Sequence, residues 1–373
     1  AWAGARWPCM TGFEKVRMVR SMADGVLREQ EDEEIRRAGY IHLYGVSETS
    51  ALLAGRRCLS ATTAAVAGML HDIYTYRTGF QLLHAPSSAE DARVVLRDLG
   101  LFSQEEQLTI HSAILRHSDK ERVNGPYDEL LKDADVLQHY LHDPTKSFPA
   151  PVAQRIRAVA AELGLPAVEV RVDDARSAAW EGDPGRRARL ADIAEELARR
   201  PLVGDANQSG PDVWPLIRYF PGARRDQGWE WCASFVYHCA MQAGLTLPIR
   251  YPGVSCRFAA VLAWLEWAQL PETSFFHRGD EPGFAPERGD LIVYDRLVSG
   301  TEHDHIGVVL GLDDCTLIVA EGNVNNRSGV FRRHRFQQVN GFIRVEDTYR
   351  YAWPYDRVVN PGSGTSTPLA AFQ

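Results

Sequence analysis

The sequence predicts two domains, an all-α domain followed by an α+β domain with an antiparallel sheet. The chain has 373 residues, which is more than one ordinary hydrophobic core accommodates. Residues 11–165 carry apolar side chains at helical spacing almost throughout. From residue 211 onward the chain is aromatic and rich in short apolar runs typical of strands. Helices first and antiparallel strands afterwards indicate an α+β arrangement.

Composition narrows the class of protein. With 45% hydrophobic and 24% charged residues, the chain is typical of a soluble globular protein. A formal net charge of −8 argues against general nucleic-acid binding, so no duplex partner is expected. No apolar run reaches the length of a membrane span. The first ten residues include Arg6 and make a poor signal peptide, so we expect a cytoplasmic location and leave export open.

The first domain, residues 11–165, is expected to be a set of helices. Ser47, Ser88 and Ser103 are predicted helix starts, and Gly100 and Gly164 are predicted stops. The helical segments are expected at residues 14–30, 47–59, 62–72, 88–100, 103–118, 127–141 and 150–164.

A linker and a second domain follow. Residues 166–210 are predicted to be a linker with one amphipathic helix at roughly 185–199, and this helix could belong to either neighbouring domain. The second domain is expected at 211–357, and 358–373 are expected to form a flexible tail. Within the second domain we expect helices at 232–244 and 257–268, and strands at 290–295, 305–312, 315–322, 329–336 and 341–345.

A histidine–aspartate set in the first domain has the composition of a metal site. "AGMLHDIYTY" places His71 and Asp72 at the end of an apolar helix, with His42 upstream and Asp135 downstream. Two neutral imidazoles and two carboxylates suit Mn²⁺, Fe²⁺, Zn²⁺ or Mg²⁺. Adjacent helical residues point about 100° apart, so His71 and Asp72 can meet one ion only where the helix opens onto a cleft. Such an ion polarises a phosphoryl oxygen and lowers the pKa of bound water.

This ordered series resembles the HD-domain metal-dependent phosphohydrolases, an all-helical family, over roughly residues 14–160. The resemblance implies metal ligands at His42, His71, Asp72 and Asp135, with Asp133 as the rival for the last place. It also implies a small phosphorylated substrate, whose class stays open because "HDIY" replaces the usual "H-D-I-G" run.

Three further residues are weighed for a second metal or for substrate. His117, in "AILRHS", falls where some family members use an additional histidine. His111 lies six residues earlier on a different helical face, and a surface position is the alternative for it. Lys120, with Arg122 behind it, could meet a phosphate or lie in a solvated loop.

The second domain presents a candidate nucleophile in "GWEWCASFVYHCAMQAG". Cys232 stands in the first turn of a predicted helix, where unpaired N–H groups and the positive end of the helix dipole stabilise a thiolate and an oxyanion. Cys239 lies two turns deeper and is expected in the core, and His238 is expected to be a partly exposed bystander. The three cannot share one ion, and the tryptophans of "WEW" are expected to wall the cleft.

A base and its partner are expected from a hairpin downstream. "EHDHIGVVLG" offers His303 and His305, and "LIVAEGNVNN" offers Glu321 and Asn323. If Asp313-Asp314 is the two-residue turn, His305 lies opposite Gly322, beside both polar candidates.

The pieces "WCASFV", "RGDLIVYD", "DHIGVVLG", "AEGNVNN" and "GFIRV" occur in order and resemble the CHAP (cysteine, histidine-dependent amidohydrolase/peptidase) domains of the NlpC/P60-like, papain-like group, over about 211–350. The resemblance implies a papain-like fold with Cys232 as nucleophile and His305 as base, His303 being the fallback. It implies Glu321 as the group that orients the imidazole and Asn323 as an auxiliary polar residue. It implies no cofactor in this domain, and a peptide, peptidoglycan fragment or peptide conjugate as substrate.

The sequence therefore predicts a two-domain hydrolase. One domain hydrolyses phosphoesters with a divalent metal ion (Mn, Fe, Zn or Mg), and the other hydrolyses amide or peptide bonds with a thiol. Two alternatives stay open: a single-activity cysteine amidase whose HD-like domain is a regulatory ligand-binding module, and a non-enzymatic wall- or partner-binding protein.

Overall fold

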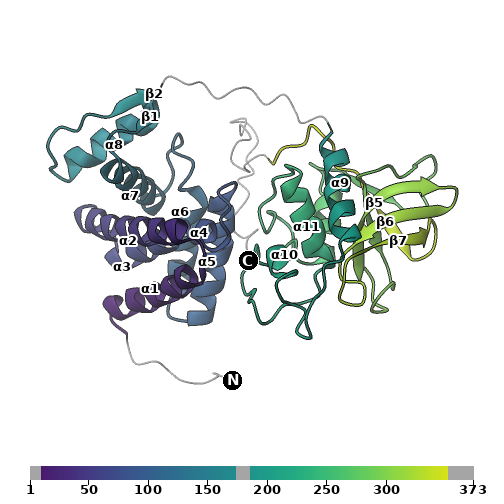
Figure 1. Ribbon diagram of the computed structural model, residues 1–373. Helices are drawn as coiled ribbons and strands as arrows, with labels where there is room; N and C mark the ends of the chain where they lie inside the picture. The colour runs from purple at the N-terminus through teal and green to yellow at the C-terminus, as the bar shows by residue number, and fades with distance from the viewer. Residues whose placement is uncertain (1–9, 174–184, 352–373) are drawn as a thin grey trace. The chain divides into compact units, whose positions relative to one another are not determined.

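The structure is a computed structural model that describes residues 10–173 and 185–351 (Figure 1). The chain divides into two compact units, residues 1–178 and 179–373, and each is described by itself. The expected tail at 358–373 lies outside the described residues. A helical domain followed by an α+β domain was predicted, and this prediction is confirmed.

The first unit consists of helices with one small addition. A short parallel pair of strands, β1 (Ser147–Pro149) and β2 (Arg171–Asp173), lies beside the helix α8 (Ala150–Glu162) and was not predicted. The helices are α1 (Gly12–Glu29), α2 (Glu33–Arg56), α3 (Ala61–Leu70), α4 (Ile73–Thr78), α5 (His84–Leu99), α6 (Gln104–Arg116), α7 (Pro126–His142) and α8 (Ala150–Glu162). None of the helices in the described residues is long and apolar enough to cross a membrane.

Of the three serines predicted to begin helices, one does so and two do not. Ser103 does begin α6, where its side chain and that of Glu106 form a capping box. Ser47 was predicted wrongly, because it lies inside α2 and its Oγ donates to the carbonyl of Ala65 at 2.9 Å. Ser88 was also wrong, since it lies inside α5 and its Oγ accepts from the backbone N–H of Tyr74. Both are buried serines whose polar group bonds to a neighbouring helix.

Close packing of α2 on α3 sets the frame of the helical unit. A Cβ added at Gly68 of α3 would lie 2.8 Å from the Cα of Ser47 on α2, so a glycine is needed where the two backbones meet. The turn between α3 and α4 is thereby fixed against α2, with α7 packed on the same helices. Residues on α2, in that turn and on α7 consequently come close together.

The second unit is a six-stranded sheet with helices packed against it. The strand order is β3-β8-β4-β5-β6-β7 and the pairs are antiparallel. The helices are α9 (Arg186–Arg199), α10 (Trp214–Ile217), α11 (Cys232–Gln242) and α12 (Val261–Gln269). The strands are β3 (Phe276–Arg278), β4 (Leu291–Tyr294), β5 (His305–Asp313), β6 (Thr316–Glu321), β7 (Gly329–His334) and β8 (Val339–Ile343).

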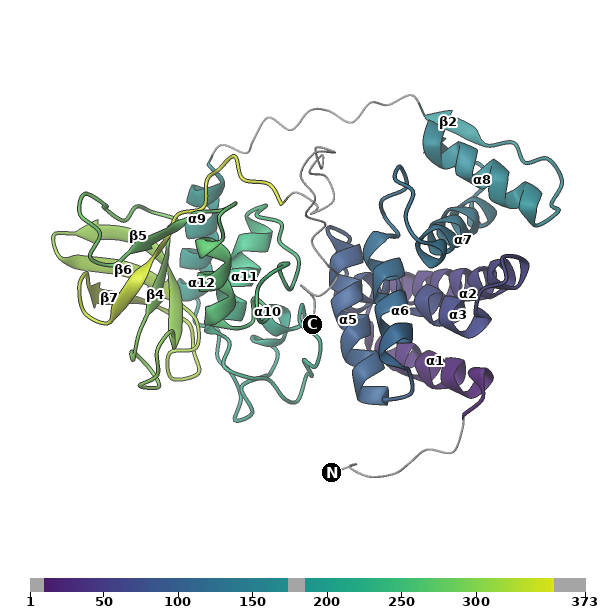
Figure 2. The same ribbon diagram turned by 180° about the vertical axis from the view of Figure 1, so that it is seen from behind.

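The amphipathic helix of the expected linker belongs to this second unit. α9 packs against α11 and against β5, β6 and β7. Figures 1 and 2 show α9, α10 and α11 together on one side of the sheet. The apolar core of the sheet is fully buried and consists of Ile292, Tyr294, Val309, Leu317, Val319 and Phe342.

The β5–β6 hairpin differs from its predicted register. Asp313 pairs with Thr316, so the two-residue turn is Asp314-Cys315, and Asp314 has the positive φ of 52° that such turns require. Leu310 is an extra residue on β5, a β-bulge between Val309 and Gly311. The predicted Asp313-Asp314 turn was therefore wrong by one residue. Gly311 lies beside the bulge, but Gly307 of the same strand pairs regularly with Glu321, so the glycines alone do not locate it.

Candidate active sites

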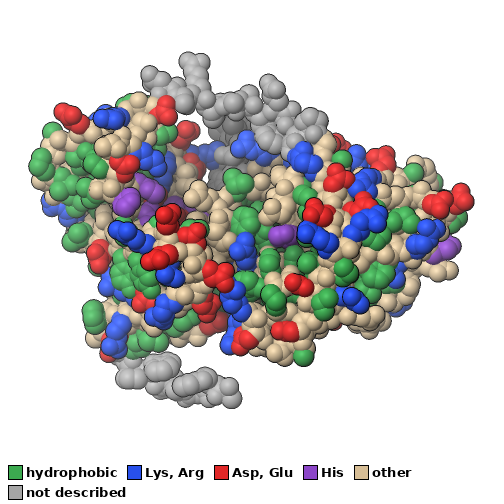
Figure 3. Space-filling view, viewed as in Figure 1, with side chains coloured by type: hydrophobic (Ala, Val, Ile, Leu, Met, Phe, Trp, Pro, Cys, Tyr) green, Lys and Arg blue, Asp and Glu red, His purple; other side chains and the backbone are tan. Residues whose placement is uncertain are grey.

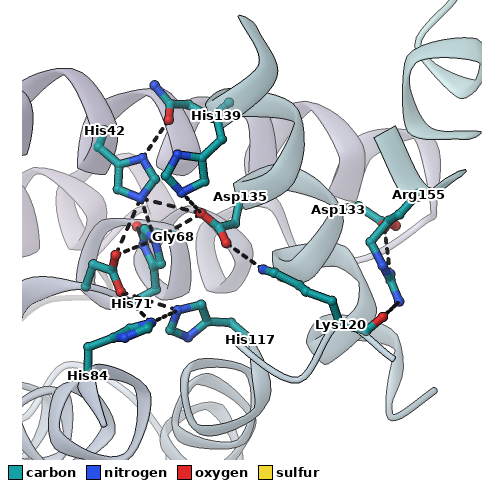
Figure 4. A network of polar contacts seen from close by, with 12 residues as sticks. His42, Gly68, His71, His84, His117, Lys120, Asp133, Asp135, His139 and Arg155 are labelled. Atoms are coloured by element: carbon teal, nitrogen blue, oxygen red, sulfur yellow. Dashed lines mark hydrogen bonds and ion pairs between the residues drawn. The ribbon is translucent and has the colours of Figure 1, made fainter. Parts of the chain in front are cut away.

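Four ligand atoms of the helical unit face one point (Figure 4). His42 comes from α2, His71 and Asp72 from the turn between α3 and α4, and Asp135 from α7. The Nε2 atoms of His42 and His71 are 3.0 Å apart. Each lies 3.5 to 3.7 Å from Asp72 Oδ2 and Asp135 Oδ1. Ligands that bind one ion at about 2.0–2.2 Å lie at such separations from one another, so these residues fit a divalent cation.

The helix break explains how adjacent residues reach one point. α3 ends at Leu70 and α4 begins at Ile73, so His71 and Asp72 stand in a turn rather than on one continuous helix. The sequence predicted one helix through both residues, with the condition that it open onto a cleft. The structure meets that condition by ending the helix.

The histidine rings are fixed from behind. His42 Nδ1 donates to Gln138 Oε1 at 2.6 Å, and His71 Nδ1 donates to the carbonyl of Gly68 at 2.8 Å. Because these acceptors engage Nδ1, each Nε2 is the ring nitrogen directed inward, where it can bind an ion. His84 and His117 are held in the same way by the carbonyls of Gln81 and Ile114, each at 2.7 Å.

A second group of ligand atoms shares Asp72 with the first. Asp72 Oδ1 faces His117 Nε2 at 3.3 Å and His84 Nε2 at 3.5 Å. The two Nε2 atoms of His84 and His117 are 3.1 Å apart. The Asp72 carboxylate therefore has one oxygen in each group, an arrangement that fits two adjacent cations.

His84 was missed by the sequence reasoning. It is the first residue of α5 and follows Leu83, whose φ of 52° turns the chain toward the site. The available signal was a histidine just past the glycine stop of the preceding helix. No acidic neighbour in sequence marked it.

Charge at this site is consistent with cation binding. Asp72 Oδ1 and Asp135 Oδ1 are buried and accept no hydrogen bond within the described residues. Burial opposes ionisation of both carboxylates, but the facing His71 on one and Lys120 on the other hold their pKa values well below the ordinary range. Burial lowers the pKa of His117 to about 4, so this imidazole is neutral near pH 7 and free to bind a metal.

Three other candidates have definite places. Lys120 Nζ donates to Asp135 Oδ2 at 2.5 Å, so it reaches the site through a metal-ligand candidate. Asp133 points away and pairs with Arg155 at 2.7 Å (Figure 4). It also pairs with Arg57, at 2.7 Å. His111 is buried in α6 and belongs to neither ligand group of the described residues, so the alternative of a surface position was wrong.

The ligand groups open into a cavity of about 570 Å³. His84, His117, His139 and Lys120 line its polar part, and histidine side chains gather at the surface of the helical unit in the space-filling view (Figure 3). His139 was not predicted; its Nε2 lies 3.3 Å from Asp135 Oδ1. Ile35, Ala38, Val136, Phe148, Pro149 and Val152 line the apolar part.

In the second unit, Cys232 is the first residue of α11 and is buried. The first helical hydrogen bond runs from Phe235 N–H to the carbonyl of Trp231, at 2.8 Å. The N–H groups of Cys232, Ala233 and Ser234 therefore precede the helical ladder and are directed at the thiol end of the helix. Trp231 is fully buried, so the expectation that it walls a cleft was wrong, whereas Trp229 is half-buried.

His305 and Glu321 form a buried pair beside this thiol. His305 is the first residue of β5 and its Nε2 donates to Glu321 Oε2 at 3.0 Å, which leaves Nδ1 as the second ring nitrogen. Burial would lower the pKa of His305, but hydrogen bonding and charge from Cys232 and Glu321 raise it to about 9. The imidazole is thus protonated at neutral pH and places a positive charge beside Cys232.

The bulge at Leu310 decides which face Glu321 occupies. Gly307 lies opposite Glu321, so His305 and Glu321 are diagonal neighbours on the same face. In the predicted register, with His305 opposite Gly322, Glu321 would have pointed to the other face. One extra residue in β5 therefore makes the His305–Glu321 pair.

Close packing joins the end of β6 to the start of α11. A Cβ on Gly322 would lie 2.6 Å from the Cβ of Phe235 and 2.9 Å from the ring of Trp231. A glycine is needed there for Glu321 and His305 to approach Cys232.

The remaining candidates of this unit have no hydrogen bond to this pair within the described residues. Asn323 follows with a φ of 60° and makes no hydrogen bond to the imidazole within the described residues. His303, the fallback base, has its Nδ1 3.0 Å from Asp295 and lines a separate cavity of about 640 Å³. His238 bonds to the Tyr219 hydroxyl at 3.0 Å, and Cys239 is fully buried.

Arg333 was missed entirely. It lies on β7, and its guanidinium donates twice to Glu321, from Nε to Oε1 at 2.8 Å and from Nη2 to Oε2 at 2.6 Å. In the sequence it was one of three arginines in "FRRHRF". Side-chain alternation along a strand does not say which of these arginines points toward the site.

Comparisons with known proteins agree with both descriptions. The HD domain family model matches residues 39–140, a range that contains His42, His71, Asp72, His117 and Asp135. The CHAP domain family model matches residues 224–323, a range that contains Cys232, His305, Glu321 and Asn323. No curated protein and no solved structure gives a significant match. Both families are usually hydrolases, and the chain carries an HD domain followed by a CHAP domain.

Proposed function

We propose that the chain is a hydrolase with two catalytic sites of different chemistry. The HD domain is a metal-dependent phosphohydrolase, and the CHAP domain is a thiol-dependent amidohydrolase or peptidase. The proposal for the HD domain rests on the ligand atoms of His42, His71, Asp72 and Asp135 that face one point. The proposal for the CHAP domain rests on Cys232 at a helix start beside the His305–Glu321 pair.

In the HD domain, His42, His71, Asp72 and Asp135 would hold one divalent ion, and Asp72, His84 and His117 a second. Bound there, such ions supply Lewis acidity toward a phosphoryl oxygen and a lowered pKa for water. Lys120 orients Asp135 through its hydrogen bond and adds positive charge at the rim of the cavity. The apolar wall around Phe148 and Val152 contacts the organic group to which the phosphate of the substrate is attached.

Metal analysis of the purified full chain tests this assignment. We expect bound divalent metal in the wild type and loss of the ion held by the first ligand group, about half of the metal, in His71→Ala, because one imidazole with a fixed ring is removed. His142→Ala is the matched control, an exposed histidine at the end of α7. Metal content unchanged in His71→Ala, or absent from the wild type after metal supplementation, contradicts the assignment.

In the CHAP domain, the Cys232 thiolate attacks the carbonyl carbon of the substrate amide. The oxygen takes up the negative charge beside the N–H groups of Cys232 and Ala233. The C–N bond breaks as protonated His305 gives its proton to the leaving amine, and a thioester to Cys232 remains. Neutral His305 then removes a proton from water, whose oxygen attacks the thioester. The acid product leaves and the thiolate returns with His305 protonated.

Turnover of an amide substrate tests this second assignment. Cys232→Ala is expected to lower kcat/KM on the order of 10³-fold or more, because the nucleophile is removed. Cys315→Ala, at the exposed β5–β6 turn, is the control and is expected to keep full activity. Full activity of Cys232→Ala on a substrate that the wild type cleaves would exclude Cys232 as nucleophile.

A further inference from the structure

The carboxylate behind His305 is held by a second cation. Glu321 is fully buried, and a buried carboxylate is costly unless it is paired and hydrogen-bonded. His305 supplies one donor, to Oε2 at 3.0 Å. Arg333 supplies two, at 2.8 and 2.6 Å, one to each oxygen. A planar guanidinium that contacts both oxygens fixes the plane of the carboxylate as well as its position.

Arg333 reaches this carboxylate from some distance along the sheet. On β7 it lies opposite Leu317, whereas Glu321 lies opposite Gly329. Its guanidinium carbon lies 4.9 Å from the centre of the Phe331 ring, which supports the extended side chain. The neighbouring Arg332 is 66% exposed and makes one contact of 3.4 Å with Asp313. Of these two adjacent arginines, Arg333 is the one whose guanidinium is held by a carboxylate and an aromatic ring.

The groups that face the imidazole come from several elements. They are Cys232 from α11, Tyr294 from β4, Glu321 from β6 and, behind Glu321, Arg333 from β7. Burial and the Glu321 charge hold the pKa of Tyr294 well above its ordinary value, so this phenol stays neutral. Burial opposes ionisation of Glu321, but Arg333 and His305 lower its pKa, so it stays charged. On the side of Glu321, His305 is therefore exposed to the negative charge of that carboxylate and to the positive charge of the Arg333 guanidinium.

We propose that Arg333 is a positioning residue of the CHAP site, which fixes the Glu321 carboxylate against His305 and offsets part of its negative charge. The proposal rests on the proposed thiol chemistry of Cys232. Arg333 lies beyond the residues that match the CHAP family model. Its role is electrostatic as well as structural: a carboxylate without its guanidinium would bind imidazolium more strongly, and the proton would be harder to deliver to a leaving amine.

Titration of His305 by NMR of histidine-labelled full-length chain tests the proposal without any substrate. Glu321→Gln is expected to lower the pKa of His305, because the negative partner is lost. Arg333→Met is expected to shift it in the opposite direction, upward by roughly half a unit or more, because the carboxylate is no longer offset. Arg332→Met is the matched control on the same strand and is expected to shift nothing.

An upward shift in Arg333→Met supports the inference. No shift, or a downward shift like that of Glu321→Gln, overturns it. If Arg333→Met does not fold, Arg333→Gln is measured instead, since it removes the charge but keeps an N–H donor, and the same upward shift is expected. Alkylation of Cys232 by iodoacetamide in the wild type separates the two claims. If Cys232 reacts no faster than exposed Cys315, the proposed thiol function fails, whatever the titration shows.

Discussion

At the residue scale, the proposed role of His305 sets the pH range in which the CHAP site is expected to act. Its pKa of about 9 lies above the ordinary value of 6.5, so the proton is held throughout the neutral range and lost as the pH rises through about 9. The leaving amine needs that proton. We therefore expect kcat/KM for amide cleavage to fall on the alkaline side with an apparent pKa near 9.

Cys232 and Glu321 both raise the pKa of His305, and a change at Glu321 keeps the nucleophile in place. In Glu321→Gln the alkaline fall should move to lower pH, since a neutral amide no longer attracts the imidazolium. Glu302→Gln, an exposed carboxylate paired with Arg296, should leave the profile unchanged. The pH profile of kcat/KM measures both variants, and an alkaline fall at the same pH in wild type and Glu321→Gln would contradict the assignment.

A second prediction at this scale concerns His84. Because His84 contacts Asp72 Oδ1 and His117 but not His42 or His71, it belongs to the second ligand group alone. We expect His84→Ala to keep one bound metal ion per chain where the wild type holds two. Metal content by mass spectrometry decides it, and complete loss of metal in His84→Ala would show that the two groups do not act as separate sites.

Candidate residues could be named from the sequence where chemistry and order agreed. His71-Asp72 and Cys232 were proposed because each belongs to an ordered series of motif elements, since a His-Asp pair alone at a helix end indicates little. Asp135 was preferred to Asp133 by resemblance alone, and helix geometry accounts for the difference, since two positions turn a side chain by about 200°. His84 and Arg333 were not predictable, because each reaches its site through a contact that no local spacing encodes.

At the element scale, the strands were predictable and their register was not. The apolar runs of β4, β5 and β6 were visible in the sequence, but their glycines do not locate the bulge, because Gly311 lies beside it whereas Gly307 pairs regularly. Likewise the helix expected at 62–72 ends two residues early, at Leu70, so that His71 and Asp72 lie in a turn. In both cases tertiary packing selects the local irregularity on which the site depends.

The contact of β6 with α11 gives a prediction for Gly322. A methyl group there would meet Phe235 and Trp231 at 2.6 to 2.9 Å, so we expect Gly322→Ala to lower the free energy of unfolding by roughly 1–3 kcal/mol. We also expect slower alkylation of Cys232, since His305 is pushed away from it. Gly311→Ala on β5 has open space at its Cβ and serves as control. Denaturant unfolding and alkylation rates measure both, and equal behaviour of the two variants would contradict this packing argument.

At the scale of the whole molecule, each unit has its own core. Leu43, Val66 and Ile114 are fully buried in the first unit, as are Phe235 and Val319 in the second. Domains with separate cores generally fold alone. We expect residues 1–178 and 179–373, expressed separately, each to unfold cooperatively.

Function should divide along the same boundary. The first fragment should bind divalent metal, and the second should retain an alkylation-sensitive Cys232. Metal analysis and mass spectrometry of the labelled fragments check this. Loss of thiol reactivity in the second fragment, with its fold intact, would favour the alternative in which the HD domain regulates the amidase.

The histidines anchored from behind have a thermodynamic consequence. Fixing a freely rotating side chain costs up to about 2 kcal/mol of rotamer entropy. In His42, His71, His84 and His117, hydrogen bonds from Nδ1 to nearby acceptors have already fixed the rings during folding. The rotamer entropy of these imidazoles is therefore lost when the helical fold forms. Binding of a cation does not have to order them again.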